Sequence, residues 1–198
     1  MTKLYKCLIL CFSSLFWPSY ASAHLVTTGL GPVYDGIGPL VMTPEDLIPA
    51  LAIALFAGLR GAAPGRRALF VLPLTWFIGG LLGVVIEGLP TLPVAAMSFL
   101  ILGVLVAADL KLSPRWITAI VIGVGLLHGV LNGIALKEGA GVLGLIGIMA
   151  SLFVIVAIVS ALVVSFKQSW TKIVVRVAGS WMAAMGMLMF GWMMRGQG

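Results

Sequence analysis

The stretch "WITAIVIGVGLLHGVLNGIAL", residues 116–136, is apolar along most of its length and contains no Asp, Glu, Lys or Arg. A run of about 20 such residues spans the roughly 30 Å of hydrocarbon in a bilayer as one helix. His128 and Asn132 lie within it, four residues apart, so both side chains share one face of the helix. Polar groups are costly inside a membrane, and this pair therefore needs a partner or a function.

Five further apolar runs accompany this one, at about 44–60, 68–88, 92–109, 141–166 and 172–194. Only 9% of the chain is charged and 61% is hydrophobic, whereas roughly 25% of the residues in a soluble domain are charged. The sequence therefore predicts an all-α membrane protein with a six-helix transmembrane bundle over residues 44–198. The net charge of +6 does not indicate nucleic-acid binding, because the basic residues lie in short loops between the apolar runs.

Residues 1–23 have the pattern of a cleaved signal peptide. Lys3 and Lys6 precede a short apolar core, and the small residues Ala21-Ser22-Ala23 suit signal peptidase. Cleavage there makes His24 the first residue of the mature chain and removes both cysteines, which leaves no disulfide and no thiolate metal site. An uncleaved signal anchor is the alternative.

Residues 24–43 are rich in glycine and are predicted to be a periplasmic segment that lies against the outer mouth of the bundle. The pair Asp35-Gly36 within this segment is typical of a turn.

The distribution of basic residues predicts the orientation. With a cleaved signal peptide, the loops after the first, third and fifth runs are cytoplasmic, and both mature termini lie in the periplasm of a bacterial inner membrane. The cytoplasmic side then carries eight basic residues and the outer side two, as the positive-inside rule requires. The eight are Arg60, Arg66, Arg67, Lys111, Arg115, Lys167, Lys172 and Arg176, and the two are Lys137 and Arg195.

Asp46 is expected near His128 and Asn132. The first apolar run opens on "TPED", in which Thr43 is a helix N-cap, Pro44 the first helical residue, and Asp46 a first-turn carboxylate. In the predicted topology Asp46 and Asn132 lie at similar depth near the outer surface. One interpretation is a cation site formed by Asp46, His128 and Asn132. The alternatives are a proton relay, or a packing seam along Gly125, Gly129 and Gly133 with His128 hydrogen-bonded across it.

Two other features suggest metal chemistry. A free amine and imidazole at His24 would chelate nickel, copper or zinc, although His24 also simply follows the cleavage site. The last apolar run is rich in methionine, which suits Cu(I) but is also a flexible apolar filler. These methionines spread around the helix, and this favours packing.

The chain resembles the HupE/UreJ family of hydrogenase and urease accessory membrane proteins over essentially its full length. The similar features are a signal ending before "AH" at 23–24, the glycine-rich outer segment, the acidic "TPEDL" at 43–47 and "HGVLNG" at 128–133. The resemblance implies six mature spans and secondary transport of nickel or cobalt.

Two family motifs are reduced in this chain. The resemblance matches Asp46 to the aspartate of a His-Pro-x-x-Gly-x-Asp-His motif, with Leu40 and Leu47 in place of its histidines. It matches His128, with Gly129 and Gly133, to a His-Gly-His-Ala-His-Gly motif, in which Val130 and Asn132 replace histidines.

These observations lead to three hypotheses. The first is a permease for a divalent transition metal (nickel or cobalt, with copper as a further option), without enzymatic activity. Its ligands are His128 and Asp46, assisted by Asn132 and His24. The second is an accessory subunit that transports nothing and docks a partner protein; a homo-oligomer through glycine-rich helix faces is also expected. The third is an intramembrane hydrolase that pairs His128 with Ser98, Ser151 or Ser180. The chain contains no Walker motif, so the sequence gives no indication of ATP-driven transport by this chain.

Overall fold

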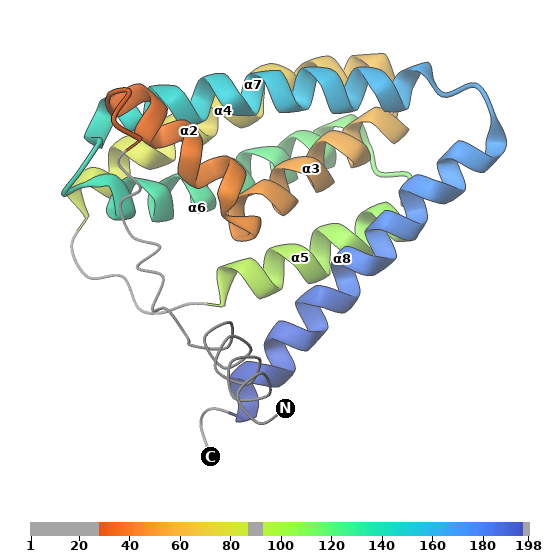
Figure 1. Cartoon of the computed structure of the whole chain (residues 1–198). Coiled ribbons are helices and arrows are strands. Elements are labelled where there is room, and N and C mark those ends of the chain that lie inside the picture. The colour runs from red at the N-terminus through yellow and green to blue at the C-terminus, as the bar shows by residue number, and fades with distance from the viewer. Residues whose placement is uncertain (1–27, 87–92, 196–198) are drawn as a thin grey trace, which may run out of the picture.

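The computed structural model describes residues 28–86 and 93–195, and all of its regular structure there is helical (Figure 1). The helices are α2 (Pro32–Met42), α3 (Pro44–Leu59), α4 (Ala62–Val85), α5 (Val94–Ala107), α6 (Pro114–Leu136), α7 (Gly141–Ser165) and α8 (Ser169–Arg195). Helices α3 to α8 coincide with the six predicted apolar runs to within a few residues, apart from the earlier start of α4. The predicted all-α class is confirmed. The predicted signal peptide and His24 lie outside the described residues.

Not every one of the six helices is long enough to cross a bilayer alone. Helices α4, α6 and α7, together with Trp170–Arg195 of α8, are long and apolar enough. Helices α2 and α3 together would form a fifth span, but the chain bends by 76° between them at Thr43. Helix α5 is apolar but has 14 residues, which extend about 21 Å and fall short of the hydrocarbon thickness. The count of six spans thus stays a prediction.

Glycines bring α4 and α6 together. A Cβ on Gly129 of α6 would lie 2.1 Å from the carbonyl oxygen of Trp76, and one on Gly133 would lie 2.1 Å from that of Gly80. Contacts this short mean that the two backbones approach with no side chain between them. The predicted stripe of Gly125, Gly129 and Gly133 is therefore a packing seam, and its partner is α4 of the same chain.

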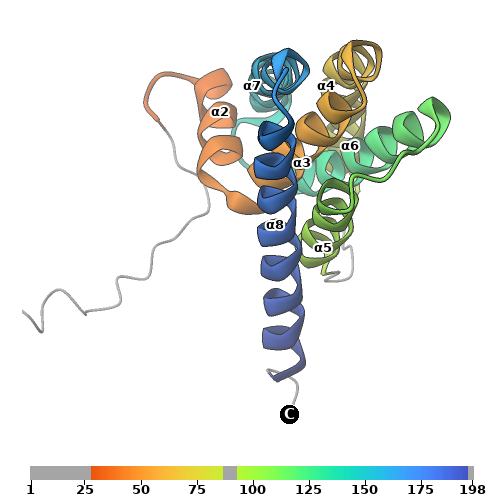
Figure 2. The ribbon, with the colours of Figure 1, turned by 90° about the vertical axis from the view of Figure 1, so that its right-hand side faces the viewer.

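The helices form two groups. Helices α2, α3, α4, α6 and α7 form a body, while α5 and α8 pack along each other beside it (Figures 1 and 2). Glycines again allow close approach, because a Cβ on Gly186 of α8 would lie 2.5 Å from the amide nitrogen of Leu100. Helix α3 is the main contact between the pair and the body. A homo-oligomer or docked partner would need surfaces other than these glycine stripes, because they are occupied within the chain.

The prediction of a turn at Asp35-Gly36 is wrong, because both residues lie inside α2. Helix α2 packs against α7, and a Cβ on Gly36 would lie 1.9 Å from the carbonyl oxygen of Gly144. Pro32 starts the helix, and this close backbone packing outweighs the weak helix propensity of glycine. Residues 24–27 of the glycine-rich segment lie outside the described part of the chain. The periplasmic location of residues 24–43 stays a prediction.

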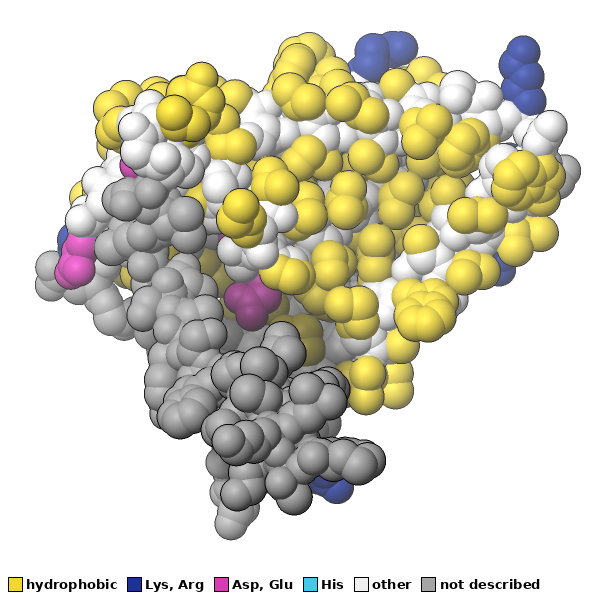
Figure 3. Space-filling model, viewed as in Figure 1, with side chains coloured by type: hydrophobic (Ala, Val, Ile, Leu, Met, Phe, Trp, Pro, Cys, Tyr) yellow, Lys and Arg dark blue, Asp and Glu magenta, His cyan; other side chains and the backbone are white. Residues whose placement is uncertain are grey.

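The surface is that of a membrane protein. Hydrophobic side chains cover most of the face shown in Figure 3, and the basic side chains lie at its edges. Helix α8 is the extreme case, because Trp181, Leu188 and Trp192 are each more than two-thirds exposed. Such a continuous apolar surface is stable in contact with lipid and not with water.

Candidate cation site

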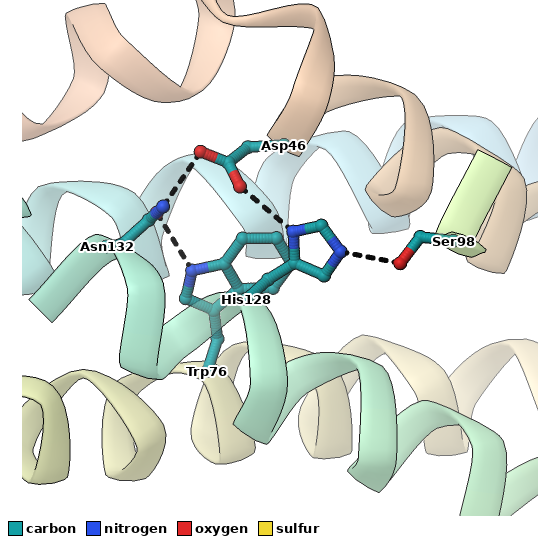
Figure 4. Close-up of polar contacts among 5 residues, drawn as sticks. All are labelled: Asp46, Trp76, Ser98, His128 and Asn132. Atoms are coloured by element: carbon teal, nitrogen blue, oxygen red, sulfur yellow. Dashed lines mark hydrogen bonds and ion pairs between the residues drawn. The ribbon is translucent and has the colours of Figure 1, made fainter. Parts of the chain in front are cut away.

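Four helices supply the side chains of one polar cluster in the interior (Figure 4). Asp46 lies in the first turn of α3, directly after the bend at Thr43. His128 and Asn132 lie one turn apart in the last third of α6. Trp76 comes from the middle of α4 and Ser98 from the first half of α5. The predicted group of Asp46, His128 and Asn132 is therefore brought together, and two residues join it.

A continuous chain of hydrogen bonds connects the five side chains. His128 Nδ1 lies 3.0 Å from Asp46 Oδ1, and His128 Nε2 lies 2.9 Å from Ser98 Oγ. The amide nitrogen of Asn132 donates to Asp46 Oδ2 over 2.8 Å. Trp76 Nε1 donates to the amide oxygen of Asn132 over 3.1 Å. Each polar atom of the pair His128 and Asp46 thus has a partner.

The chemistry of the donors fixes the direction of these bonds. An indole N–H can only donate, so the Asn132 atom that faces Trp76 is the oxygen, and the amide nitrogen faces Asp46. An ionised Asp46 can only accept, so in a neutral imidazole the proton is on Nδ1 of His128. His128 Nε2 then carries the lone pair, and the Ser98 hydroxyl donates to it.

Where the cluster faces the helices of the body, its side chains are almost fully buried. His128 is 1% exposed and Trp76 is 0% exposed, and their rings lie 5.2 Å apart between centroids. The α4–α6 glycine seam produces this contact, because Gly129 packs directly on the backbone of Trp76. The ring of His128 thus lies against Trp76 of α4, while its hydrogen bonds go to α3 and α5.

A cavity of about 690 Å³ opens onto Asp46, His128 and Asn132 from one end of the bundle. Its wall is formed by the N-terminal ends of α3 and α5, the C-terminal ends of α6 and α8, and parts of α2 and α7. Asp35, Glu45 and Asp46 line it, which is three of the six acidic residues in the chain. Among its described lining residues there is no Lys or Arg. Figure 3 shows acidic side chains in a hollow near the junction of α2 and α3. The cavity is therefore suited to a cation.

The ligands available for a metal are few. Within residues 28–86 and 93–195, no group of three or more His, Cys, Asp or Glu side chains lies close enough together to hold a metal ion. His128 and Asp46 are the adjacent pair of that kind, and the oxygen of Asn132 is engaged by Trp76. Met189 and Met193 of α8 line the cavity as thioethers. The fourth predicted ligand, His24, lies outside the described residues.

Sequence reasoning did not find the role of Trp76. Its place near the middle of an apolar run was a usable signal, because a buried indole N–H needs an acceptor and most membrane tryptophans lie at span ends. Ser98 was named as a partner for His128 in the hydrolase hypothesis alone. Nothing in its local sequence distinguishes it from the other serines in apolar runs.

Comparison with known proteins identifies the family of the chain. The family model described as "HupE / UreJ protein" matches residues 12–189. Protein HupE of Rhizobium leguminosarum bv. viciae is 27% identical over 187 residues, which cover 88% of this chain and 92% of that protein. No solved structure gives a significant match. The chain is thus a multi-pass membrane protein that belongs to the HupE/UreJ family of hydrogenase/urease accessory membrane proteins.

Proposed function

We propose that this protein is a secondary transporter, without enzymatic activity, of a divalent transition-metal ion such as nickel or cobalt in the bacterial inner membrane. The observation that carries the proposal is a cavity with acidic walls that ends at a buried His–Asp pair. Imidazole nitrogen suits nickel, and a carboxylate supplies the negative charge that lowers the cost of bringing a cation into a bilayer. His128 and Asp46 are the proposed ligands, with Asn132 and His24 in supporting roles.

The charge on the cavity wall supports the cation as cargo. Asp35 and Glu45 lie outside the His128–Asp46 pair and line the approach to it. Like charges concentrated in one concave surface raise the local concentration of counter-ions, and low-dielectric walls strengthen the effect. The approach therefore attracts cations and repels anions before any ligand bond forms.

The hydrogen bonds define what a metal ion must displace. Ser98 occupies the lone pair of His128 Nε2, so coordination there requires the hydroxyl to turn away. Asn132 donates to Asp46 Oδ2 and holds the carboxylate in place, with Trp76 orienting the amide. In the proposed site His128 and Asp46 bind the ion, while Asn132 positions Asp46.

Uptake by the purified protein in liposomes tests the proposal. His128→Ala and Asp46→Asn should each abolish nickel or cobalt uptake per folded molecule, because each removes one of two ligands. Thr118→Ala is the matched control, since Thr118 lies on α6 and its hydroxyl bonds to the carbonyl of Pro114 in its own helix. Normal specific uptake by His128→Ala would instead make this histidine a helix-packing residue, whose loss lowers stability alone.

The geometry also supports a second candidate, a serine hydrolase. Ser98, His128 and Asp46 are connected in the order of a Ser-His-Asp triad, in which Ser98 Oγ would attack an acyl carbonyl while His128 Nε2 takes its proton. Two observations rank it lower. Ser98 is not among the described residues that line the cavity, and the chain has no Gly-x-Ser-x-Gly elbow.

Ser98→Ala separates the two functions. In a metal site the substitution removes the hydroxyl that competes for His128 Nε2, so nickel should bind about fivefold more tightly, equivalent to one net hydrogen bond of about 1 kcal/mol. In a hydrolase the same substitution abolishes labelling by a fluorophosphonate probe. Calorimetric titration with nickel and probe labelling, each on wild type and variant, give opposite results for the two functions.

A further inference from the structure

We propose that the cargo enters the cavity as a metal chelate, in which a small amino-acid-type chelator with nitrogen donors stays bound to the ion. This inference rests on the proposed function and names the chemical class of its substrate. Three features of the described residues support it: the number of ligands, the size and composition of the cavity wall, and the sign of its charge.

The described residues supply too few ligands for a bare ion. Divalent nickel, cobalt and copper take four or more ligands, and the described residues bring together one imidazole and one carboxylate. Asn132 adds at most one weak oxygen ligand, because its amide oxygen already accepts from Trp76 and its nitrogen faces Asp46. Within the described residues no further His, Cys, Asp or Glu completes the ligand set, so groups that arrive with the metal would fill the remaining positions.

The cavity is larger and more apolar than a hydrated ion needs. Six waters at about 30 Å³ each occupy roughly 200 Å³, whereas the cavity holds about 690 Å³. That volume is in the range of about 300–1,000 Å³ found for sites that hold small organic molecules. Part of the wall is apolar and is formed by Leu131, Ile148, Met189 and Met193. These side chains offer no hydrogen bonds to water ligands but can pack against a carbon skeleton.

The charge of the wall selects the kind of chelator. Asp35, Glu45 and Asp46 face the cavity, and no Lys or Arg does so among the described residues. Nickel with citrate carries net negative charge and would be repelled, while nickel with histidine is neutral or positive. A chelator with amine and imidazole donors also leaves positive charge on the metal to be balanced by the carboxylates of the wall.

Double-label uptake into proteoliposomes tests the inference. Radioactive nickel is supplied alone, with tritiated histidine, or with labelled citrate, at equal total nickel. We expect at least severalfold more nickel uptake with histidine than with nickel alone, accumulation of histidine in fixed ratio to the metal, and the lowest uptake with citrate. Nickel that enters without histidine, at a rate set by the free ion, would overturn the inference and leave metal transport intact. No nickel uptake in any form would overturn the proposed function as well.

A wall variant tests the role of cavity volume. Ala135 is exposed and lines the cavity, one turn beyond Asn132 on α6. Ala135→Trp should sharply reduce uptake of the nickel–histidine complex while nickel binding at His128, measured with nickel alone, persists. Ala119→Trp is the control, because Ala119 is exposed on the same helix and lies outside the cavity. Equal nickel–histidine uptake by the two variants would contradict the chelate as cargo.

Discussion

Asn132 illustrates how a single residue is used in the cluster. The amide meets a pure donor, Trp76, on one side and a pure acceptor, Asp46, on the other. An amide satisfies both neighbours at once, and neither a carboxylate nor an apolar group of the same size does so. Where the family resemblance places a histidine, this chain therefore has a residue that holds Asp46 in position.

Replacing this amide by a carboxylate should make the fold depend on metal. Asn132→Asp puts two carboxylates in contact and removes the donor to Asp46, so the variant without metal should lose about 2 kcal/mol of stability. Added nickel neutralises both charges and should raise the melting temperature of the variant more than that of wild type. Thermal unfolding in detergent with and without nickel measures both effects.

Asn132→Leu is the control for this experiment, because it also removes the donor to Asp46, together with the acceptor for Trp76, and adds no charge. It should be destabilised, and nickel should raise its melting temperature no more than that of wild type, because His128 and Asp46 remain and no second charge is added. An equal nickel-induced shift in wild type and Asn132→Asp would mean that the metal binds elsewhere.

The sequence predicts part of this cluster. The spacing of four puts His128 and Asn132 on one face, and the caps of the first apolar run put Asp46 at similar depth; the structure confirms that these three meet. The positions of Trp76 and Ser98 depend on which helices are neighbours and on their rotation. Uniformly apolar runs contain little periodicity that would fix either property.

At the scale of helices, the glycines decide how close α4 and α6 come, and so where Trp76 lies relative to His128 and Asn132. Gly129→Ala would place a methyl group 2.1 Å from the Trp76 carbonyl oxygen, which is backbone and cannot turn aside. The helices would have to separate. We expect a large loss of thermal stability in detergent together with weaker nickel binding.

Gly123→Ala is the matched control for the seam. Gly123 lies on the same helix, and a Cβ there meets nothing within 4 Å. Because alanine is the better helix former, this variant should be as stable as wild type or gain roughly 0.5–1 kcal/mol. Similar behaviour of the two variants would show that helix propensity, and not close packing, is the important property of these glycines.

Helix positions were the most predictable feature of the chain, because apolar length and the caps at Thr43 and Pro44 are local properties. Helix α2 was not predicted. Its Asp-Gly and Gly-x-Gly sequence favours turns, and the backbone contact of Gly36 with Gly144 forms between residues far apart in the chain. Local signals do not contain that information.

On the scale of the whole molecule, the two ends of the bundle differ. At one end, α3 and α5 contribute Asp46 and Ser98 to the cluster below the open cavity. At their other ends, Arg60 after α3 forms an ion pair with Asp109 after α5. The guanidinium of Arg60 also lies 5.9 Å from the centre of the Phe56 ring. The same two helices therefore line a cavity at one end and are joined by an ion pair at the other.

A double-mutant cycle measures the interaction energy of the ion pair between Arg60 and Asp109. Arg60→Gln and Asp109→Asn should each lower stability in detergent, because each leaves one partly buried charge without its partner. The double variant should lose less than the sum of the two, since no unpaired charge remains. Additive losses would mean that the two side chains do not interact in the folded protein.

The membrane class and the bundle followed from composition, because a folded chain with so few charges is stable in lipid and not in water. The division into a body and the α5–α8 pair did not follow, since it depends on contacts between helices with equally apolar faces. The predicted orientation, with both mature termini in the periplasm, is independent of these contacts and stays a prediction.

The width of the cavity has an electrical consequence. If the proposed transporter admits ions to this opening, the opening sustains little of the membrane potential, and most of the potential would fall between the His128–Asp46 pair and the ion pair of Arg60. Along α3 these lie about 21 Å apart, at 1.5 Å per residue over the 14 positions from Asp46 to Arg60. One elementary charge that crosses the full potential exchanges about 2.3 kcal/mol per 100 mV, and a divalent ion about twice that. In the proposed transporter, cargo would therefore bind with almost no dependence on voltage, and the voltage would act on the passage beyond His128.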